Sequence, residues 1–250
     1  MLCVGAVVAA GAGGCRSTND DAGASAAVFA EVERIELPAA ETRAVRGDWP
    51  RRVVYAPIGE ISEARLVIER EPDDTGVQTR SSINEGEEAV QRRQTFAVRD
   101  DGAVVLVEEV NHAEGVEVVF DPPLVVLPAR LEVGAAIECE GRMTVHPLGD
   151  RSRVRAKGTY TETGRCEGAV TVRTPAGEFV AWKLVSELRA ELGPSRVQNE
   201  TELWISPRAG IVAERRRERT LVFGVPVRNN AESWVAESVP VSAAADQMGR

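Results

Sequence analysis

The stretch VQNETELWISPRAGIVAERRRERTL (Val197 to Leu221) contains two expected strands and the turn that joins them. From Val197 to Ile205, polar residues alternate with apolar ones, which is typical of a strand with one face in solvent. Residues 207–210 (PRAG) supply a proline with a preset φ and a glycine that accepts positive φ, which favours a turn. Because Ile211 to Leu221 then reads as a second strand, the stretch predicts an antiparallel hairpin.

Short apolar runs separated by turn residues continue on the N-terminal side of this hairpin. Helical periodicity is scarce, and only Ala26 to Glu36 is expected to form a short helix. The pattern predicts a mostly β fold with few helices, an antiparallel meander that forms one large curved sheet or a partly open barrel. The further expected strands are Ala64–Glu71, Gln94–Arg99, Val104–Val110, Val116–Phe120, Ala135–His146, Val154–Thr161, Ala169–Arg173 and Phe179–Leu188.

Glycine and proline mark the expected turns between these strands. Residues 100–102 (DDG) predict a hairpin turn, because glycine accepts positive φ at little cost. Thr163-Gly164 predicts another turn. Pro122 and Pro123 cannot donate to a β ladder, so we expect them to close the first half of the sheet.

Length and composition are those of a folded soluble protein. With 250 residues the chain is long enough to bury a substantial core, and its net charge of −9 argues against a nucleic-acid partner. The best candidate for a domain boundary is Pro122 to Gly134, but its apolar run Leu124 to Leu127 favours packing. We therefore prefer a single β domain over residues 31–241.

The first 14 residues carry no charge and end in small residues. They are too short to span a bilayer and resemble a signal peptide. Residues 12–15 (AGGC) resemble the lipobox of bacterial lipoproteins, which implies that Cys15 becomes the first mature residue and carries lipid. Ala12 stands where the lipobox usually has leucine, and no Lys or Arg precedes the apolar stretch. An ordinary cleaved signal is the alternative.

The residues after Cys15 predict a flexible link to the membrane. Residues 16–27 are polar or small, so we expect residues 15–30 to form a lipidated tether, with a disordered tail at residues 242–250. Arg16 stands where the inner-membrane retention signal of some bacteria has aspartate. The expected location is therefore the periplasmic face of the cell envelope, at the outer rather than the inner membrane.

Three segments of the second half carry a resemblance to a known family. They are DPPLVVLPARLEVG (Asp121 to Gly134), TPAGEFVAWKL (Thr174 to Leu184) and LWISPRAGIV (Leu203 to Val212). Together they resemble the TapB-like family of exported β proteins, related to a bacterial envelope domain of unknown function, over roughly Asp121 to Val239. The resemblance implies an exported β fold and carries over no catalytic residues.

Residues suited to catalysis are few. The chain has two histidines, His112 and His146, both at expected turns, and no H-E-x-x-H spacing that would hold zinc. No G-x-S-x-G sequence is present, although a Ser-His-Asp triad stays open. Adjacent carboxylates such as Glu108 and Glu109 point to opposite faces of a strand and cannot act as a catalytic pair. We assign no catalytic residue, metal ligand or cofactor.

One set of residues is a candidate ligand cleft. Arg215, Arg217 and Arg219 share one face of their expected strand and could line a basic groove or pair with Glu200 and Glu202 on the preceding strand. Tryptophans on expected strands anchor the core or line a cleft for a lipid or glycan. The candidate cleft residues are Trp182, Trp204, Arg215, Arg217 and Arg219.

Besides Cys3 in the expected signal peptide and the expected lipidated Cys15, the chain has two cysteines, Cys139 and Cys166. Export favours a disulfide between them. The expected turns near Gly149 and Gly164 would instead place the two cysteines on either side of one strand, roughly 10 Å apart and beyond the reach of a disulfide. The sequence leaves this pairing open.

The preferred function is that of a non-catalytic bacterial envelope lipoprotein that binds a lipid, a peptide or an envelope protein, with no nucleic-acid partner. The alternatives are an exported hydrolase with an unrecognised site and a purely structural accessory β module. A pocket containing His112, an acid and a serine would favour the hydrolase, and long unpaired edge strands would favour the accessory module.

The anchor at Cys15 predicts a defined mass. Protein purified from a membrane fraction of its native host should begin at Cys15 and carry acyl chains, and a Cys15→Ala variant should lack them. Intact-mass spectrometry checks this. An unlipidated wild-type mass, or one that retains Met1, would contradict the lipoprotein reading.

Overall fold

The computed structural model describes residues 28–42, 49–58, 65–73, 76–84 and 89–239, and the secondary-structure elements in this part of the chain are strands. No helix within these ranges is long and apolar enough to cross a membrane. The strands are β1 (Ala30–Ile35), β2 (Ala40–Glu41), β3 (Arg52–Pro57), β4 (Arg65–Asp73), β5 (Gly76–Asn84), β6 (Ala89–Val98), β7 (Val104–Asn111), β8 (Val116–Leu127), β9 (Arg130–Leu131), β10 (Ala136–Pro147), β11 (Ala156–Thr174), β12 (Gly177–Leu192), β13 (Ser195–Ser206), β14 (Gly210–Val222) and β15 (Val225–Ser238).

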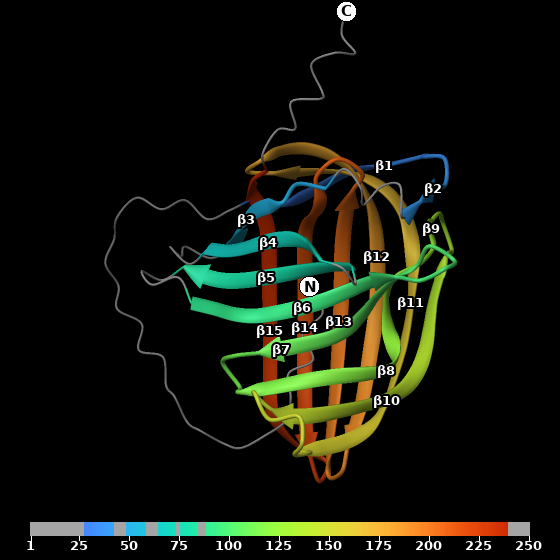
Figure 1. Ribbon diagram of the computed structural model, residues 1–250. Coiled ribbons are helices and arrows are strands. Elements are labelled where there is room, and N and C mark those ends of the chain that lie inside the picture. The colour runs from blue at the N-terminus through green and yellow to red at the C-terminus, as the bar shows by residue number, and fades with distance from the viewer. Residues whose placement is uncertain (1–27, 43–48, 59–64, 74–75, 85–88, 240–250) are drawn as a thin grey trace, which may run out of the picture.

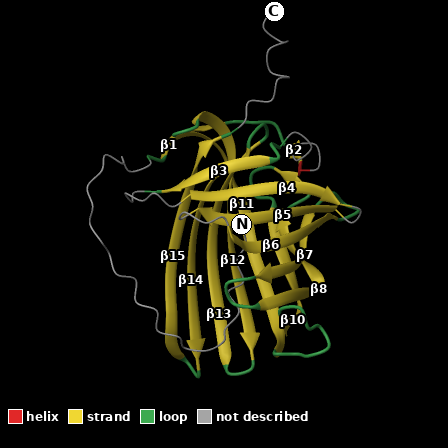
Figure 2. Ribbon diagram, turned by 60° about the vertical axis from the view of Figure 1, so that its left-hand side comes forward, coloured by secondary structure: helices red, strands yellow, loops and turns green. Residues whose placement is uncertain are grey.

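Thirteen strands form one antiparallel sheet that curls back on itself. The strand order is β1-β11-β10-β8-β7-β6-β5-β4-β3-β15-β14-β13-β12, and β12 also pairs with β11, so the pairings form a ring. The long strands β11 to β15 run upright behind β4 to β8 and β10, which cross in front of them (Figure 1 and Figure 2). The mostly β, antiparallel, curved sheet predicted from the sequence is confirmed.

The sheet buries a hydrophobic core on each face. On β13, Leu203 and Ile205 belong to a large cluster that includes Trp182 and Leu184. The residue between them, Trp204, belongs to a second cluster. Because successive side chains of a strand point to opposite faces, Leu203 and Trp204 lie on opposite sides of the sheet. We call these sides the Leu203 face and the Trp204 face.

The second cluster draws residues from both ends of the chain. Besides Trp204 it contains Tyr55 of β3, Leu66 of β4, Val172 of β11 and Val235 of β15. The Tyr55 hydroxyl donates a hydrogen bond to the Ile211 carbonyl at 2.7 Å. Burial of large side chains on both faces contributes about 2 kcal/mol for each side chain that leaves water.

The predicted turn at Thr163-Gly164 is wrong, because both residues lie inside β11. The expected strands Val154–Thr161 and Ala169–Arg173 are one continuous strand, paired with β12 from Thr159 to Thr174. Glycine is needed at position 164 for close approach and not for a turn. A Cβ there would lie 2.6 Å from the Val185 carbonyl oxygen, closer than neighbouring atoms allow.

Two other expectations from the sequence are corrected. The segment expected as a helix, Ala26 to Glu36, contains β1, which pairs with β11 and gains backbone partners there, although residues 26 and 27 lie outside the described part. Pro122 and Pro123 do not close the first half but lie within β8. The pairing of β8 with β10 ends at Asp121, so on that side the prolines remove no ladder donor.

Several predictions fall on segments that the structure does not describe. The signal peptide at residues 1–14, Cys15 and the tail at residues 242–250 all lie there. The last residues of the expected tether are described. Phe29 packs against Trp204, and Ala30 begins β1, so the folded part starts before the predicted boundary at residue 31.

The two cysteines are free, and the structure places no bond between them. Cys139 on β10 lies opposite Glu162, and Cys166 is four residues further along β11. The sequence predicted a separate strand between the two cysteines. Because no turn forms at Gly164, that strand continues as β11 and itself carries Cys166. Burial raises the pKa of the Cys139 thiol to about 11, so this side chain stays protonated and unreactive.

Glu162 is a buried acid in the middle of this region. Its side chain faces the Leu203 side, and neither carboxylate oxygen has a hydrogen-bond partner within the described ranges. Burial raises its pKa to about 8. Glu109 of β7 behaves similarly, with a pKa raised by burial to about 7. At neutral pH Glu162 therefore stays protonated.

These raised pKa values predict that the free energy of unfolding falls as pH rises. Between the ordinary pKa of about 4.5 and about 8, the unfolded chain releases the Glu162 proton while the folded chain keeps it. The contribution of protonated Glu162 to the free energy of unfolding is therefore complete below pH 4.5 and lost by about pH 8. A Glu162→Gln variant should flatten this slope and be more stable than the wild type at pH 8 by about 1 kcal/mol or more.

Urea unfolding at a series of pH values measures this slope. Glu191→Gln is the matched control, because Glu191 is exposed on the neighbouring strand β12. If the free energy of unfolding changes with pH equally in the wild type and in Glu162→Gln, the raised pKa of Glu162 is contradicted.

Candidate functional site

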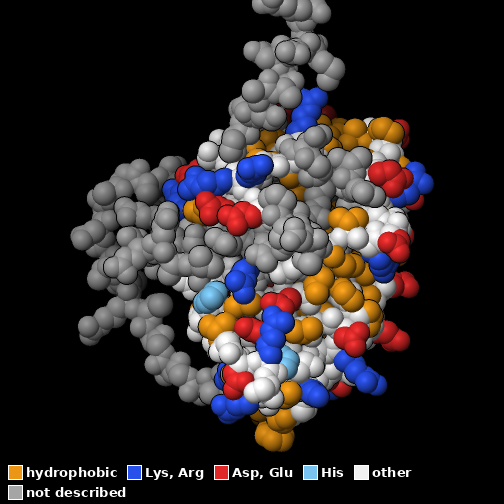
Figure 3. Space-filling view, viewed as in Figure 1, with side chains coloured by type: hydrophobic (Ala, Val, Ile, Leu, Met, Phe, Trp, Pro, Cys, Tyr) orange, Lys and Arg blue, Asp and Glu red, His pale blue; other side chains and the backbone are white. Residues whose placement is uncertain are grey.

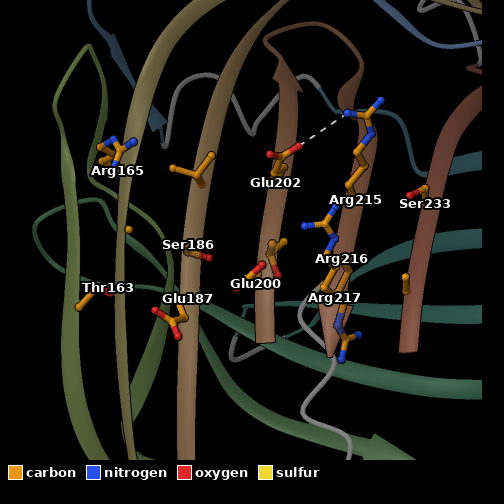
Figure 4. A pocket seen from close by; sticks show the side chains of 14 residues that line it. Thr163, Arg165, Ser186, Glu187, Glu200, Glu202, Arg215, Arg216, Arg217 and Ser233 are labelled. Atoms are coloured by element: carbon orange, nitrogen blue, oxygen red, sulfur yellow. Dashed lines mark ion pairs between the residues drawn. The ribbon is translucent and has the colours of Figure 1, made fainter. Parts of the chain in front are cut away.

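A groove of 760 Å³ crosses β11 to β15 on the Trp204 face (Figure 4). Most of its lining comes from two rows of residues that lie opposite one another from strand to strand. The first row is Thr163, Glu187, Glu200, Arg217 and Ala231. The second row is Arg165, Val185, Glu202, Arg215 and Ser233. The remaining lining residues lie between these rows on β11 to β14.

Short turns set the register that builds these rows. Two residues separate β11 from β12, β12 from β13 and β14 from β15. The β14–β15 turn is formed by Phe223 and Gly224, both with positive φ (50° and 79°), as a type I′ hairpin turn requires. Because directly opposed residues share a face, the turns place charges from four strands side by side.

The groove carries charges of both signs. Arg215 lies 3.9 Å from Glu202, and both side chains are partly exposed (47% and 40%). Glu187 and Glu200 are directly opposed like charges, an arrangement that destabilises a sheet. Arg189, outside the rows, donates to both carboxylate oxygens of Glu187 at 2.7 and 2.9 Å and offsets part of that repulsion.

An aromatic and cationic cluster borders the groove along β13. The Phe29 ring meets Trp204 edge to face, with ring centroids 4.7 Å apart. The Lys183 ammonium lies 5.1 Å and the Arg215 guanidinium 5.5 Å from the Trp204 ring, both within cation–π range. Glu31 of β1 accepts hydrogen bonds from Trp204 Nε1 at 3.0 Å and Lys183 Nζ at 2.9 Å. The cluster holds β1 and fixes the side chains at this border.

The structure gathers only part of the candidate cleft expected from the sequence. Trp204 and Arg215 are in contact, and Arg217 lines the groove. Trp182 is fully buried in the core of the Leu203 face and cannot reach the groove. Arg219 is exposed one pair further along β14, opposite Gln198 and outside the lining. The expected cross-strand pairing of this arginine face is confirmed for Arg215 and Glu202.

Sequence reasoning missed the groove residues on β11 and β12. The predicted cleft residues did not include Arg165, Val185 or Glu187, although Trp182 was predicted on the same strand as Val185 and Glu187. Their alternation along the strand was visible, but their position depends on the uninterrupted course of β11. The wrongly predicted turn at Gly164 would have put Arg165 on a separate strand.

The Leu203 face carries a second group of charges, which is buried. Arg216 donates to Asn199 Oδ1 at 2.9 Å and to Glu218 Oε2 at 2.8 Å. Burial lowers the pKa of Arg216 to about 10, so it remains charged at neutral pH. On β7, Glu109 accepts a hydrogen bond from Gln94 Nε2 at 2.7 Å. These partners offset part of the cost of burying the charges.

The histidines do not contribute to the groove. His112 is exposed in the β7–β8 turn, and the Nδ1 atom of His146 lies 2.7 Å from the Arg153 carbonyl oxygen. Neither lines the groove. In the part of the chain that the structure describes, no group of three or more His, Cys, Asp or Glu residues could hold a metal ion.

No protein-family model and no curated protein matches this sequence. The TapB-like resemblance therefore stays a prediction. Two solved structures are similar in fold. One, from Bacteroides fragilis, is described as a "putative exported protein with YmcC-like fold" and has 14% identity and a TM-score of 0.41, over 76% of this chain and 93% of its own. The other, a "putative lipoprotein" from Parabacteroides distasonis, has 12% identity and a TM-score of 0.43, over 77% of this chain and 97% of its own.

Proposed function

We propose that this chain is a non-catalytic lipoprotein of the bacterial cell envelope that binds an extended peptide segment of another envelope protein. The observation that carries the proposal is the groove across β11 to β15, with its two rows of fixed side chains. The expected anchor at Cys15 would hold the domain at the periplasmic face of a membrane, with the outer membrane preferred.

The lining of the groove favours a polar occupant. Six of its side chains are charged and stand on the two rows, namely Arg165, Glu187, Glu200, Glu202, Arg215 and Arg217. An acyl chain would leave these charges without water or partners, so a lipid tail is disfavoured. A polypeptide can present both charges and hydrogen-bonding groups to such a surface.

The same lining gives little support to catalysis. None of the 14 residues that line the groove is a histidine or a cysteine. Its serines, Ser186 and Ser233, therefore have no imidazole base beside them within the lining. The hydrolase alternative expected a histidine, an acid and a serine in one pocket, and the groove does not supply that combination.

An accessory β module is the second candidate, favoured by one edge of the sheet. From Val225 to Glu232, β15 pairs with β14 and with no other strand of the described chain. Pro226 and a register shift beside it interrupt this edge, and such features protect edges from pairing with other chains. On the face seen in Figure 3, acidic and basic side chains are interspersed, a distribution suited to solubility. We therefore prefer the groove to the edge as the binding site.

Site-specific photo-crosslinking tests the groove. A photoreactive phenylalanine analogue replaces Val185 in the groove or, as the matched control, Val180 on the same strand, which is 40% exposed outside it. Irradiation of envelopes from the native host should give a discrete protein adduct at position 185 and none at position 180. An added Arg217→Glu substitution should reduce the adduct severalfold. No adduct, or equal adducts at both positions, would contradict the proposal.

A further inference from the structure

The charges in the groove follow a definite order from strand to strand. Within the two rows, β11 contributes one cation and β14 contributes two, whereas the charged residues of β12 and β13, which lie between them, are all anions. The order across the sheet is therefore positive, negative, negative, positive. The residues, from β11 to β14, are Arg165, Glu187, Glu200 with Glu202, and Arg215 with Arg217.

The spacing of the strands sets the distances between these charges. Neighbouring strands lie about 4.8 Å apart, so β11 and β14, three steps apart, are separated by about 14 Å. The centre of the acidic zone, between β12 and β13, lies about 7 Å from each basic strand. The groove therefore presents a positive, a negative and a positive zone at intervals of about 7 Å.

An extended peptide has the same interval along one of its faces. Each residue of a strand advances about 3.4 Å, and residues i and i+2 point the same way about 7 Å apart. A peptide lying across the strands would thus place residues i, i+2 and i+4 over the three zones. Complementarity requires an acid, a base and an acid at these positions, and the symmetry of the pattern allows either chain direction.

Glu200, Arg217 and Arg165 are the groove charges most available to such a partner. Glu200 and Arg217 are directly opposed, yet the described residues give neither side chain an ion pair within 4.0 Å. Arg165 pairs with Glu167 at 2.8 Å, but Glu167 lies outside the two rows, and the arginine side chain is 65% exposed. Exposed pairs of this kind contribute about 0.5 kcal/mol each and exchange partners readily.

The uncharged residues leave room for a peptide backbone. Ala231 and Ser233 on β15 and Thr163 on β11 are small and stand at the two ends of the rows. Val185 separates Arg165 from Glu202 in the second row and offers the one aliphatic contact on β12. The central glutamates would repel a polyanion, and the flanking arginines would repel a polycation.

From this order and spacing, we propose that the groove selects extended peptides with the pattern acid-x-base-x-acid. The proposal rests on the proposed function, in which the groove binds a peptide, and adds the chemistry of that peptide. Three exposed ion pairs at about 0.5 kcal/mol each amount to a preference of about tenfold over the reversed pattern.

Fluorescence anisotropy with two labelled peptides tests this preference. One contains Glu-Thr-Lys-Thr-Glu and the other Lys-Thr-Glu-Thr-Lys, each between neutral flanks of the same length. The purified full chain should bind the first about tenfold more tightly at low salt. The difference should shrink towards zero at about 1 M salt, where screening acts within about 3 Å. Equal affinities at low salt, or no binding of either peptide, would overturn the proposal.

Substitutions inside and outside the groove test whether the groove causes the peptide preference. Arg217→Glu should lower the preference severalfold, whereas Arg196→Glu, the same charge change on an exposed arginine of β13 outside the groove, should leave it unchanged. Circular dichroism checks folding, and Arg217→Gln replaces Arg217→Glu if that variant does not fold. Equal effects of the substitutions at positions 196 and 217 would overturn the proposal.

The two levels of the proposal fail in different ways. An adduct at position 185 together with equal affinity for the two peptides would leave the peptide-binding groove standing and remove the acid-x-base-x-acid rule. Absence of the adduct together with equal affinities would remove both.

Discussion

The antiparallel register of β11 to β15 is the constraint on which the cores and the groove depend. Loops of two or three residues join these strands, so the register has little freedom to slip. Because side chains alternate with a period of two, a slip of one residue on β13 would move Leu203 and Ile205 to the wrong face. The same slip would turn Glu200 and Glu202 away from the groove and mix the two cores.

Cores on both faces explain why this sheet recruits segments from distant parts of the chain. Trp204 lies on the face opposite Leu203, and it is fully buried because Phe29 packs against it and Glu31 accepts a hydrogen bond from its indole. β3 and β4 cover the same cluster with Tyr55 and Leu66. The end of the expected lipid tether and the start of the following segment are thus fastened to the face that carries the groove.

Charged residues have different physical roles on the two faces. On the Leu203 face, Arg216 and Glu109 are buried and have hydrogen-bond partners, so a substitution of one partner leaves an unpaired polar group in a medium of low dielectric constant. On the Trp204 face, Arg215 and Glu202 are separated by 3.9 Å and remain in contact with water. Weak, solvated pairs can be exchanged for pairs with a ligand, which suits a binding surface.

The sequence by itself determined the β class, the hairpin around residues 207–210 and the shared face of Arg215 and Arg217, because alternation and turn chemistry are local. Only the tertiary structure decided which distant strands meet. The helix expected at Ala26 to Glu36 contains β1 because β11 supplies hydrogen-bond partners for its backbone. Gly164 continues a strand because Val185 approaches it closely, and this continuity brings Arg165 and Glu187 to the groove. Such pairings join residues far apart in the chain, and no local pattern encodes them.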